Sequence, residues 1–376
     1  MKITYVTETH PPDINAAALT AARAIAYLRT RGHEVDVIRP AQTHEARGAD
    51  AGEWRTVGCP IPMYREMRMG LAWPAQLGER FCRSGARVVH VATEGPLGWS
   101  ALAAARRLGV ATTSDFQARL QRYTRYHCIG CLEAPIRSYL RRFHNGAGRT
   151  FAATARTRQD LIEWGFQRVE VVDPGVDLER FAPTRRDLSL RRRWGAGQSP
   201  VLLYVGRLAA EKRVQLALEA FRSARRFDSN ARMIVVGDGP GRAALERMFP
   251  EAHFVGMQTG AALAACYASA DLFVFPSESG AFGNVTLEAL ASGLPVIAFD
   301  SGAASEHVAD RVNGRLITPG DDAGFVLAVC LMVALHGTPD RASRAARSSV
   351  ADQGCDNALR SFERHLLEVA GDGQPP

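Results

Sequence analysis

Two basic residues near the start of a predicted helix are the first candidates for chemistry. Gly206 and Arg207 follow an apolar run at 201–205 that predicts a buried strand, and Glu211 and Lys212 begin the helix that follows. A forked guanidinium and an ammonium five residues apart, at the edge of a sheet, can hold a diphosphate without a metal ion. Taken alone, such a pair is more often part of the charged surface than a site.

A second candidate lies at 271–299, where the sequence reads DLFVFPSESGAFGNVTLEALASGLPVIAF. An apolar run, a small-residue turn, a helix and a second apolar run follow one another, at 272–275, 277–283, 284–292 and 295–299, and predict a βαβ unit. The turn would direct backbone N–H groups and a helix N-terminus at one point, which attracts a phosphate or a sugar oxygen. Glu288 lies in the middle of this helix between apolar neighbours, so we expect its carboxylate to be exposed or bonded to a ligand.

The same β-α alternation runs through both halves of the chain and predicts the α/β class. We expect two doubly wound, Rossmann-like domains facing a cleft, with ligands at the carboxyl ends of their parallel strands. The first would span 1–180, joined by a C-terminal helix at 356–376, and the second would span 181–355. Residues 41–87 are rich in loops and stay unassigned, and the charged, irregular stretch at 177–200 is expected to link the domains.

Composition narrows the class of protein and its partners. The 376 residues are 46% hydrophobic and 23% charged, which is typical of a soluble globular protein with room for two domains. A net charge of +7 favours anionic partners such as phosphates, nucleotides or acidic lipid surfaces. No apolar run reaches the roughly 18–20 residues needed to span a bilayer, and the N-terminus becomes polar too soon for a secretory signal. Seven cysteines, an odd number, fit reduced thiols in the cytoplasm better than a disulfide framework.

A stretch at 119–144 combines arginines with aromatic residues. It contains Arg122, Tyr123, Arg125, Tyr126, Arg137, Tyr139, Arg141, Arg142 and Phe143. One interpretation is a solvated basic helix face; the other is a face that lies on an anionic membrane or on a phosphate-bearing acceptor. Nucleic acid is the weaker candidate partner, because no base-reading module is visible.

Four motifs together resemble those of the family 4 retaining glycosyltransferases. They are YVGRLAAEKR at 204–213, VVGDGP at 235–240, FVGMQTGAAL at 254–263 and FPSESGAFGNVTLEALASGLPVIAF at 275–299, in the order and spacing of that family. The segments VTETHPPDIN at 6–15, RGHEV at 31–35, VVHVATEGPLG at 88–98 and PGVDLERF at 174–181 are similar to family segments as well. The resemblance covers almost the whole chain and implies the GT-B fold, in which the second of two Rossmann-like domains binds most of a nucleotide sugar.

The resemblance also implies roles for individual residues on the donor side. Arg207 and Lys212, beside Gly206, would hold the phosphates of a UDP or GDP sugar, and Glu288 would bond the ribose hydroxyls. Gly256 and Met257 would lie along the base. The backbone N–H groups around Phe282, Gly283, Asn284 and Val285 would bind the β-phosphate or the sugar. No metal and no further cofactor are expected, because the positive charge of the site stabilises the departing diphosphate. The implied reaction moves a mannose- or glucose-type hexose, with retention, to a lipid or polysaccharide acceptor in the cytoplasm or at the inner face of the membrane.

Three places depart from the family pattern on the sugar and acceptor side. Gly280 stands where the family has the first of its paired glutamates. Ala16 and Ala17, after Asn15, stand where the family usually has glycine, and their methyl groups would crowd a backbone approach to the ligand. Gln117 falls near a family histidine that faces the sugar, and glutamine can donate a hydrogen bond but cannot carry a proton between partners.

These departures leave two hypotheses. Losing a hydrogen bond from a charged group to a sugar hydroxyl costs about 1.5–3 kcal/mol, which corresponds to roughly 10- to 150-fold in rate. One such loss would alter the sugar preference of an active transferase or slow it. Three together are the basis of the alternative, a catalytically impaired protein that binds a nucleotide sugar and acts as the partner subunit of an active enzyme. The intact donor side favours the active transferase.

Overall fold

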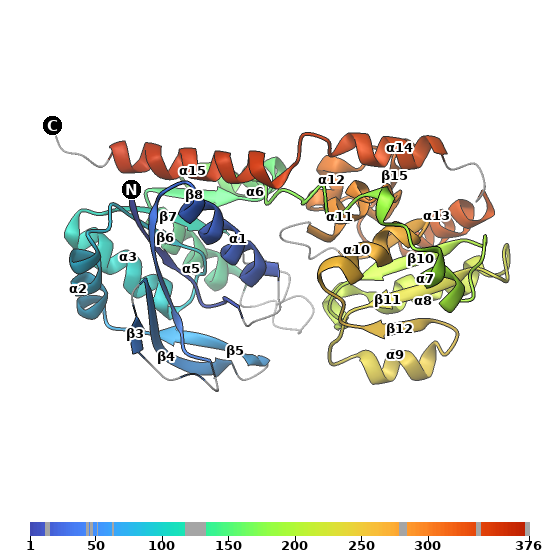
Figure 1. Cartoon of the computed structure of the whole chain (residues 1–376), viewed down its shortest axis with the longest axis horizontal. Helices are drawn as coiled ribbons and strands as arrows, with labels where there is room; N and C mark the ends of the chain where they lie inside the picture. The colour runs from blue at the N-terminus through green and yellow to red at the C-terminus, as the bar shows by residue number, and fades with distance from the viewer. Residues whose placement is uncertain are drawn as a thin grey trace. The chain divides into compact units, whose positions relative to one another are not determined.

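The computed structural model of the chain describes residues 1–11, 16–42, 45, 48–50, 52–61, 64–116, 133–277, 284–335 and 340–372. The chain divides into two compact units, each built on its own sheet (Figure 1). Unit 1 comprises Met1–Pro174 and Ala358–Pro376, and unit 2 comprises Gly175–Asn357. Within the described ranges, no helix is both long enough and apolar enough to cross a bilayer.

Unit 1 is built on a mostly parallel sheet with the strand order β3-β4-β2-β1-β6-β7-β8-β9, to which β5 is added beside β4. Its central strands are short and buried, as parallel strands between helices must be. β3 and β5 pair antiparallel with β4, whereas the other pairs are parallel. The strands are β1 (Lys2–Val6), β2 (Glu34–Pro40), β3 (Gly48–Asp50), β4 (Glu53–Ile61), β5 (Tyr64–Leu71), β6 (Val88–Val91), β7 (Ala111–Asp115), β8 (Arg149–Ala152) and β9 (Val169–Val171).

Helices cover both faces of this sheet. On one face, α1 and the C-terminal helix α15 pack around Tyr5 and Leu366, and on the other, α2 and α3 pack around Val89. α2 and α3 each begin with a proline and end at a glycine in the left-handed conformation, Gly85 and Gly109, which stops each helix ahead of the next strand. The helices are α1 (Ala16–Thr30), α2 (Pro74–Ser84), α3 (Pro96–Leu108), α5 (Glu133–Asn145), α6 (Ala155–Glu163) and α15 (Cys355–Asp372).

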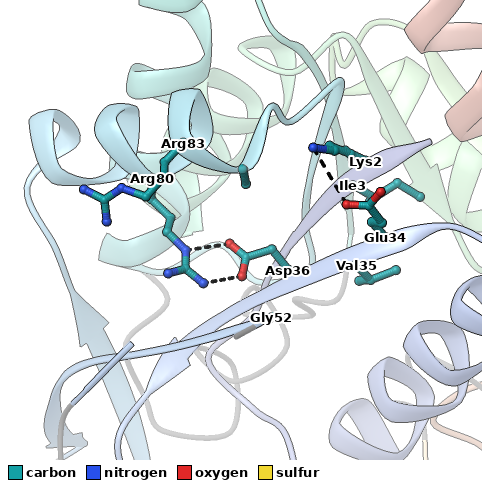
Figure 2. Close-up of a pocket in the computed structure, with 9 residues that line it drawn as sticks. Lys2, Ile3, Glu34, Val35, Asp36, Gly52, Arg80 and Arg83 are labelled. Atoms are coloured by element: carbon teal, nitrogen blue, oxygen red, sulfur yellow. Dashed lines mark hydrogen bonds and ion pairs between the residues drawn. The ribbon is translucent and has the colours of Figure 1, made fainter. Parts of the chain in front are cut away.

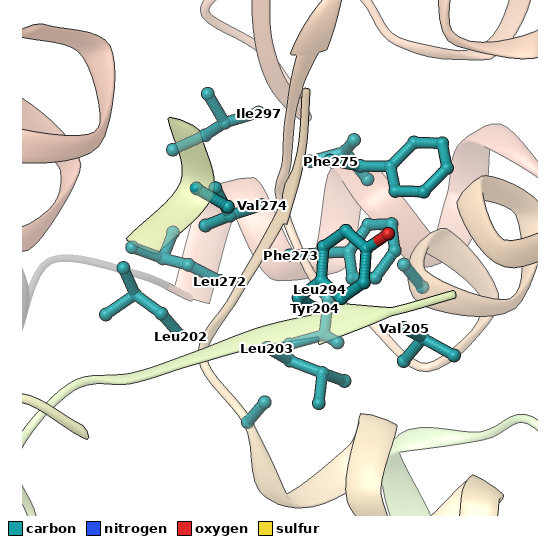
Figure 3. Packing of buried hydrophobic residues seen from close by; sticks show 14 of the residues in the cluster. Leu202, Leu203, Tyr204, Val205, Leu272, Phe273, Val274, Phe275, Leu294 and Ile297 are labelled. Atoms are coloured by element: carbon teal, nitrogen blue, oxygen red, sulfur yellow. The ribbon is translucent and has the colours of Figure 1, made fainter. Parts of the chain in front are cut away.

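Unit 2 is a parallel six-stranded sheet with the order β12-β11-β10-β13-β14-β15. Its core joins side chains of β10, β13 and β14, with the rings of Tyr204, Phe273 and Phe275 in contact (Figure 3). The strands are β10 (Val201–Val205), β11 (Arg232–Val236), β12 (His253–Gly256), β13 (Leu272–Phe275), β14 (Val296–Phe299) and β15 (Gly314–Ile317). The helices are α7 (Leu188–Arg193), α8 (Val214–Ala224), α9 (Arg242–Met248), α10 (Gly260–Ser269), α11 (Asn284–Ala291), α12 (Ala303–His307), α13 (Asp322–Ala334) and α14 (Asp340–Ser349), with 3-10 turns η2 (Pro183–Arg185) and η3 (Ala210–Lys212).

Each sheet has one position at which the strand order reverses direction. In unit 1, β2 lies on one side of β1 and β6 on the other; in unit 2, β11 and β13 flank β10 in the same way. The loops that leave the carboxyl ends of such a pair run to opposite sides and leave room for a ligand. The prediction of two doubly wound α/β domains is confirmed, and each sheet has one such switch point.

Two stretches are more regular than the sequence indicated. The described part of 41–87, which stayed unassigned, forms β3, β4, β5 and α2. The expectation that 177–200 is an irregular link is wrong, because this stretch belongs to unit 2 and contains α7. Arg191 of α7 is 3% exposed and donates to Asp271 Oδ2 and to the carbonyls of Ser269 and Ser199, each at 2.8 Å.

Candidate active site

The turn after β10 carries Arg207 at the switch point of unit 2. Tyr204 is fully buried, and its hydroxyl donates a hydrogen bond to the carbonyl of Arg207 at 3.1 Å (Figure 3 shows the phenol). Burial raises the pKa of Tyr204, and the Glu211 carboxylate raises it further, so the phenol stays protonated and able to donate. Tyr204 thereby fixes the turn that holds the half-buried Arg207 at the edge of the sheet.

Close backbone packing holds the neighbouring loops against this turn. Gly237 follows β11 with φ 134°, and a Cβ there would lie 2.0 Å from the carbonyl oxygen of Gly206. The Gly237 N–H donates to the carbonyl of Gly256, at the end of β12, at 2.9 Å. Only glycine fits at position 237. The first glycine of the VGDGP segment is therefore required by the contact of three loops at the carboxyl edge of the sheet.

Lys212 ends η3 and lies near the end of β13, the strand beside β10. Its ammonium is 6.0 Å from the ring centroid of Phe275, the last residue of β13. The next residue, Arg213, has φ 51°, forms an ion pair with Asp322 and lies 5.2 Å from the ring centroid of Phe299. These contacts fix the turn, so both basic residues selected from the sequence lie in the segment after β10, with the Lys212 ammonium beside the carboxyl end of the adjacent strand β13.

Glu288 is the partly exposed residue in a largely buried part of α11. Its neighbours Leu287 and Ala289 are fully buried. The phenol of Tyr267, also fully buried, lies close enough to Glu288 that the carboxylate adds to burial in raising the pKa of the phenol. On its exposed side, the Glu288 carboxylate can accept hydrogen bonds from two neighbouring hydroxyl groups of a ribose.

Other predicted donor-side residues lie at the ends of the same strands and helices. Asn284 begins α11, and its Oδ1 is buried without a hydrogen-bond partner in the described part of the chain. Buried amide oxygens without a partner are uncommon, and a ligand hydroxyl could satisfy this one. Val285, the next residue, packs partly against the core. Gly256 has φ 72°, and Met257 beside it is 51% exposed, which leaves an apolar surface on which a base could lie.

Several predicted positions lie outside the described residues: Asn15, Gln117, Gly280, Phe282 and Gly283. Of the predicted acceptor-side positions, Ala16 and Ala17 are the first two residues of α1. The structure therefore places Arg207 and Lys212 in the segment after β10, and Glu288 within α11, the helix that follows β13. The roles assigned to all these residues stay predictions.

A carboxyl group that the sequence reasoning did not select lies at the switch point of unit 1. Glu8 follows β1, and its backbone N–H donates to Thr93 Oγ1 at 3.0 Å, in the loop after β6. The Glu8 carboxylate accepts from the N–H of Leu97 at 3.4 Å and lies against Gly95, where a Cβ would be 2.1 Å from its oxygens. Burial raises the pKa of Glu8 to about 7, with a contribution from the charge of Glu94. Glu8 can therefore gain and lose a proton near neutral pH.

Glu94 completes an acidic pair at this edge. Its Oε1 is 3.4 Å from Nε2 of the buried His144, whose Nδ1 is 2.9 Å from Ser114 Oγ. The hydroxyl of Tyr139, on α5, donates to the carbonyl of Glu94. Carboxylates in this position can accept hydrogen bonds from the hydroxyl groups of a sugar or polyol. The available sequence signal was a glutamate soon after each of two apolar strands, in YVTE and HVATE.

A pocket of about 330 Å³ lies at the opposite edge of the same sheet, near the amino ends of β1 and β2 (Figure 2). Arg80 of α2 donates to both carboxylate oxygens of Asp36 on β2, at 2.8 and 2.5 Å. Lys2 and Glu34 stand 3.8 Å apart beside it. This pocket contains none of the predicted site residues, and its ion pair fastens α2 to the sheet.

Comparisons with known proteins place the chain in a family. Residues 199–334 match the model of glycosyl transferases group 1, and residues 17–180 match that of glycosyltransferase family 4. The chain is 34% identical, over 97% of its length and 98% of the relative, to the GDP-mannose-dependent alpha-mannosyltransferase of Mycolicibacterium smegmatis. The chain belongs to glycosyltransferase family 4. The resemblance inferred from the four motifs is confirmed, and this glycosyltransferase is, as predicted, a hexosyltransferase.

A more distant relative and a solved structure extend the comparison. The glycosyltransferase is 25% identical, over 98% of its length and 86% of the relative, to the alpha-monoglucosyldiacylglycerol synthase of Streptococcus pneumoniae. Its structure is similar to the sucrose-phosphate synthase of Thermosynechococcus elongatus, with a TM-score of 0.80 and 16% identity, over 99% of this chain and 100% of that chain. This similarity shows that the glycosyltransferase has the GT-B fold, as the motifs implied.

Proposed function

We propose that this glycosyltransferase moves a mannosyl residue, with retention of the anomeric configuration, from GDP-mannose to a lipid acceptor. The observation that carries the proposal is the 34% identity, over nearly the full length of both chains, to a GDP-mannose-dependent alpha-mannosyltransferase. A lipid acceptor is supported by the similarity to a synthase of monoglucosyldiacylglycerol. The alternatives kept from the sequence are a UDP sugar as donor and a polysaccharide as acceptor.

In this proposal, the residues of unit 2 act mainly through electrostatics. Arg207 and Lys212 hold the diphosphate, and Glu288 accepts hydrogen bonds from the ribose. As the acceptor hydroxyl bonds to the anomeric carbon, the bond from that carbon to the β-phosphate oxygen breaks. The oxygen keeps the electron pair and takes the acceptor's proton. Removing one fixed charge or donor that stabilises such a leaving group costs about 2.7–4 kcal/mol, or roughly 10²- to 10³-fold in rate.

We place the reaction at an anionic membrane surface, because the described part of the arginine-rich stretch has the required pattern. In α5, Leu140 and Phe143 are fully buried, whereas Arg141 and Arg142 are exposed. A helix with an apolar inner face and a basic outer face can lie against acidic lipid headgroups. Such contact would keep the enzyme beside a lipid acceptor.

A transfer assay with a panel of donors tests the proposal. Purified enzyme is incubated with GDP-mannose, UDP-glucose or UDP-galactose, with and without lipid extract. Release of nucleoside diphosphate and the mass of the extracted lipids are followed together. We expect release only with GDP-mannose and extract, and a lipid heavier by one hexose that α-mannosidase removes. Arg207→Ala should lower kcat by roughly 10²- to 10³-fold, whereas Arg193→Ala, an exposed arginine of α7, should not.

Other outcomes would revise the proposal in defined ways. Transfer from a UDP sugar alone would overturn the donor assignment. Donor binding without release, with every donor and extract, would favour the hypothesis of a non-catalytic partner subunit. Retention of full activity by Arg207→Ala would contradict the assigned leaving-group site.

A further inference from the structure

Helix α13 presents an apolar face to solvent in unit 2. From Ala323 to the C-cap Leu335, the exposed residues of this helix are all apolar: Ala323, Leu327, Leu331, Ala334 and Leu335. Leu327, Leu331 and Leu335 are 58%, 43% and 61% exposed. Residues four apart share one helix face, so Ala323, Leu327, Leu331 and Leu335 form a stripe about 18 Å long, the α13 stripe.

The core of unit 2 is complete without this stripe. The opposite side of α13 packs against α8, β14 and β15 through buried residues such as Phe325, Val329 and Val333. A surface helix normally carries charged residues on its outer side, yet the one charged residue of α13 is Asp322, at its first position. An exposed apolar stripe with charges at its rim is typical of a contact surface for a partner.

The two ends of the stripe have opposite charge. Asp321 and Asp322 are exposed at its N-terminal end, where Arg213 forms an ion pair with Asp322 and leaves a net negative charge. Arg226 is exposed and lies two residues after the end of α8, the helix that packs against α13. Burial raises the pKa of the Cys330 thiol, in the second half of α13, and the charge of Arg226 is close enough to lower that pKa. The stripe therefore runs from an acidic end to a basic flank.

We propose that the α13 stripe is the surface through which two copies of the chain associate, as an antiparallel helix pair about a two-fold axis. When the pair is centred between Leu327 and Leu331, Leu327 meets the partner's Leu331, and Ala323 meets the partner's Leu335. The small Ala323 then faces the larger Leu335 at both ends, and leucines face each other at the centre, so the same surface on each copy fits its partner. The antiparallel direction also brings the acidic end of each helix toward the basic flank of the other, whereas a parallel pair would place like charges together. An anionic membrane fits this face less well, because Asp321 and Asp322 lie at one end of it.

Sedimentation equilibrium over a range of protein concentrations tests the proposal. We expect the natural chain to dimerise with a dissociation constant on the order of micromolar. Leu331→Glu buries a charge at the centre of the pair and should raise this constant by roughly 100-fold or more. The matched control is Leu188→Glu, because Leu188 on α7 is 61% exposed and lies outside the stripe, so dimerisation should be unchanged. Arg226→Glu should weaken the dimer by about tenfold through its charge alone.

Circular dichroism and thermal unfolding at low concentration establish that each variant folds. A natural chain that stays monomeric at about 100 µM would overturn the proposal, since a specific dimer should form there. A dimer that Leu331→Glu weakens no more than Leu188→Glu does would also overturn it. Flotation of a monomeric chain with anionic vesicles, lost in Leu331→Glu, would instead assign the face to lipid.

Discussion

Glu8 is a carboxyl group under two opposing influences. Burial and the charge of Glu94 favour its neutral form, whereas the N–H groups of Leu97 and Gly70 favour the charged form. Burial has the larger effect, since the pKa rises from 4.5 to about 7. Between these two values, the folded chain holds a proton at Glu8 that the unfolded chain has released.

Glu8→Gln should therefore make the stability of the protein less dependent on pH. Below pH 4.5, Glu8 is protonated in both the folded and the unfolded state. As the pH rises through about 7, the natural chain must ionise a buried carboxyl group and loses stability, whereas glutamine has no proton to lose. The variant should exceed the natural protein by on the order of 2 kcal/mol at pH 8, and the difference should shrink toward pH 5.

Urea unfolding of both proteins at pH 5 and pH 8 measures this difference. Glu163→Gln, on an exposed residue of α6, is the matched control and should change stability equally at both pH values. If Glu8→Gln shifts stability by the same amount at both pH values, Glu8 does not titrate as the structure indicates.

The predictions for the donor side rest on a stronger sequence signal than those for the acceptor side. Arg207, Lys212 and Glu288 could be selected as candidates because each is a charge beside an apolar run, within motifs of characteristic spacing. Glu8 and Glu94 were not selected, because a glutamate after a strand is common. Only the order of the sheet, with β1 beside β6, brings this pair together.

Helix α5 is the part of the chain on which the membrane proposal rests. Replacing Arg141 and Arg142 together by glutamate reverses two exposed charges and leaves the buried Leu140 and Phe143 in place. Each basic residue near an anionic surface contributes about 1 kcal/mol, so the fraction that floats with anionic vesicles should fall at least roughly tenfold. Arg192 and Arg193, both exposed on α7 in unit 2, provide the control double replacement.

Flotation should be unchanged in that control and should weaken as salt is added, because the attraction is electrostatic. Equal flotation of the natural chain and the α5 variant would remove α5 from the membrane contact. Activity on a lipid acceptor would then need another explanation.

Elements stabilised by distant residues could not be predicted from local pattern. The stretch at 177–200 appeared irregular because α7 is six residues long and carries three arginines, which gives no apolar period. Its stability comes from Arg191, whose partner Asp271 is 80 residues away in the sequence. A similar difficulty affects α13, which went unpredicted: it is apolar on all sides, so no period separates its buried face from its exposed one.

The architecture of the two sheets was predictable because parallel strands buried on both faces are continuous apolar runs. The runs of β10 and β13 were predicted with the bounds that the structure gives. The strands β3 and β5 were not predicted, because they pair antiparallel with β4 at one side of the sheet and lack such runs. Strand order cannot be deduced from runs alone, so the switch points became visible only in the structure.

A second property of the whole chain concerns its basic residues. Of the 46 lysines and arginines, Lys2 and Lys212 are the only lysines. All the others are arginines, so the presence of a lysine in the turn that follows Arg207 indicates a specific role for its ammonium group. A compact ammonium suits a phosphate as a point charge next to a bidentate guanidinium. The scarcity of lysine also allows Lys212 to be probed chemically in the natural protein.

We propose that unit 2 holds the donor's diphosphate with Arg207 and Lys212, and amine labelling tests this assignment. The natural protein is treated with a limiting amount of an acylating reagent, and labelling of Lys212 and Lys2 is followed by mass spectrometry. GDP-mannose at ten times its dissociation constant should slow labelling of Lys212 about tenfold and leave Lys2, in unit 1, unchanged. GDP should protect as well, whereas mannose should not. Unchanged labelling of Lys212 at a donor concentration that saturates transfer would contradict the claim.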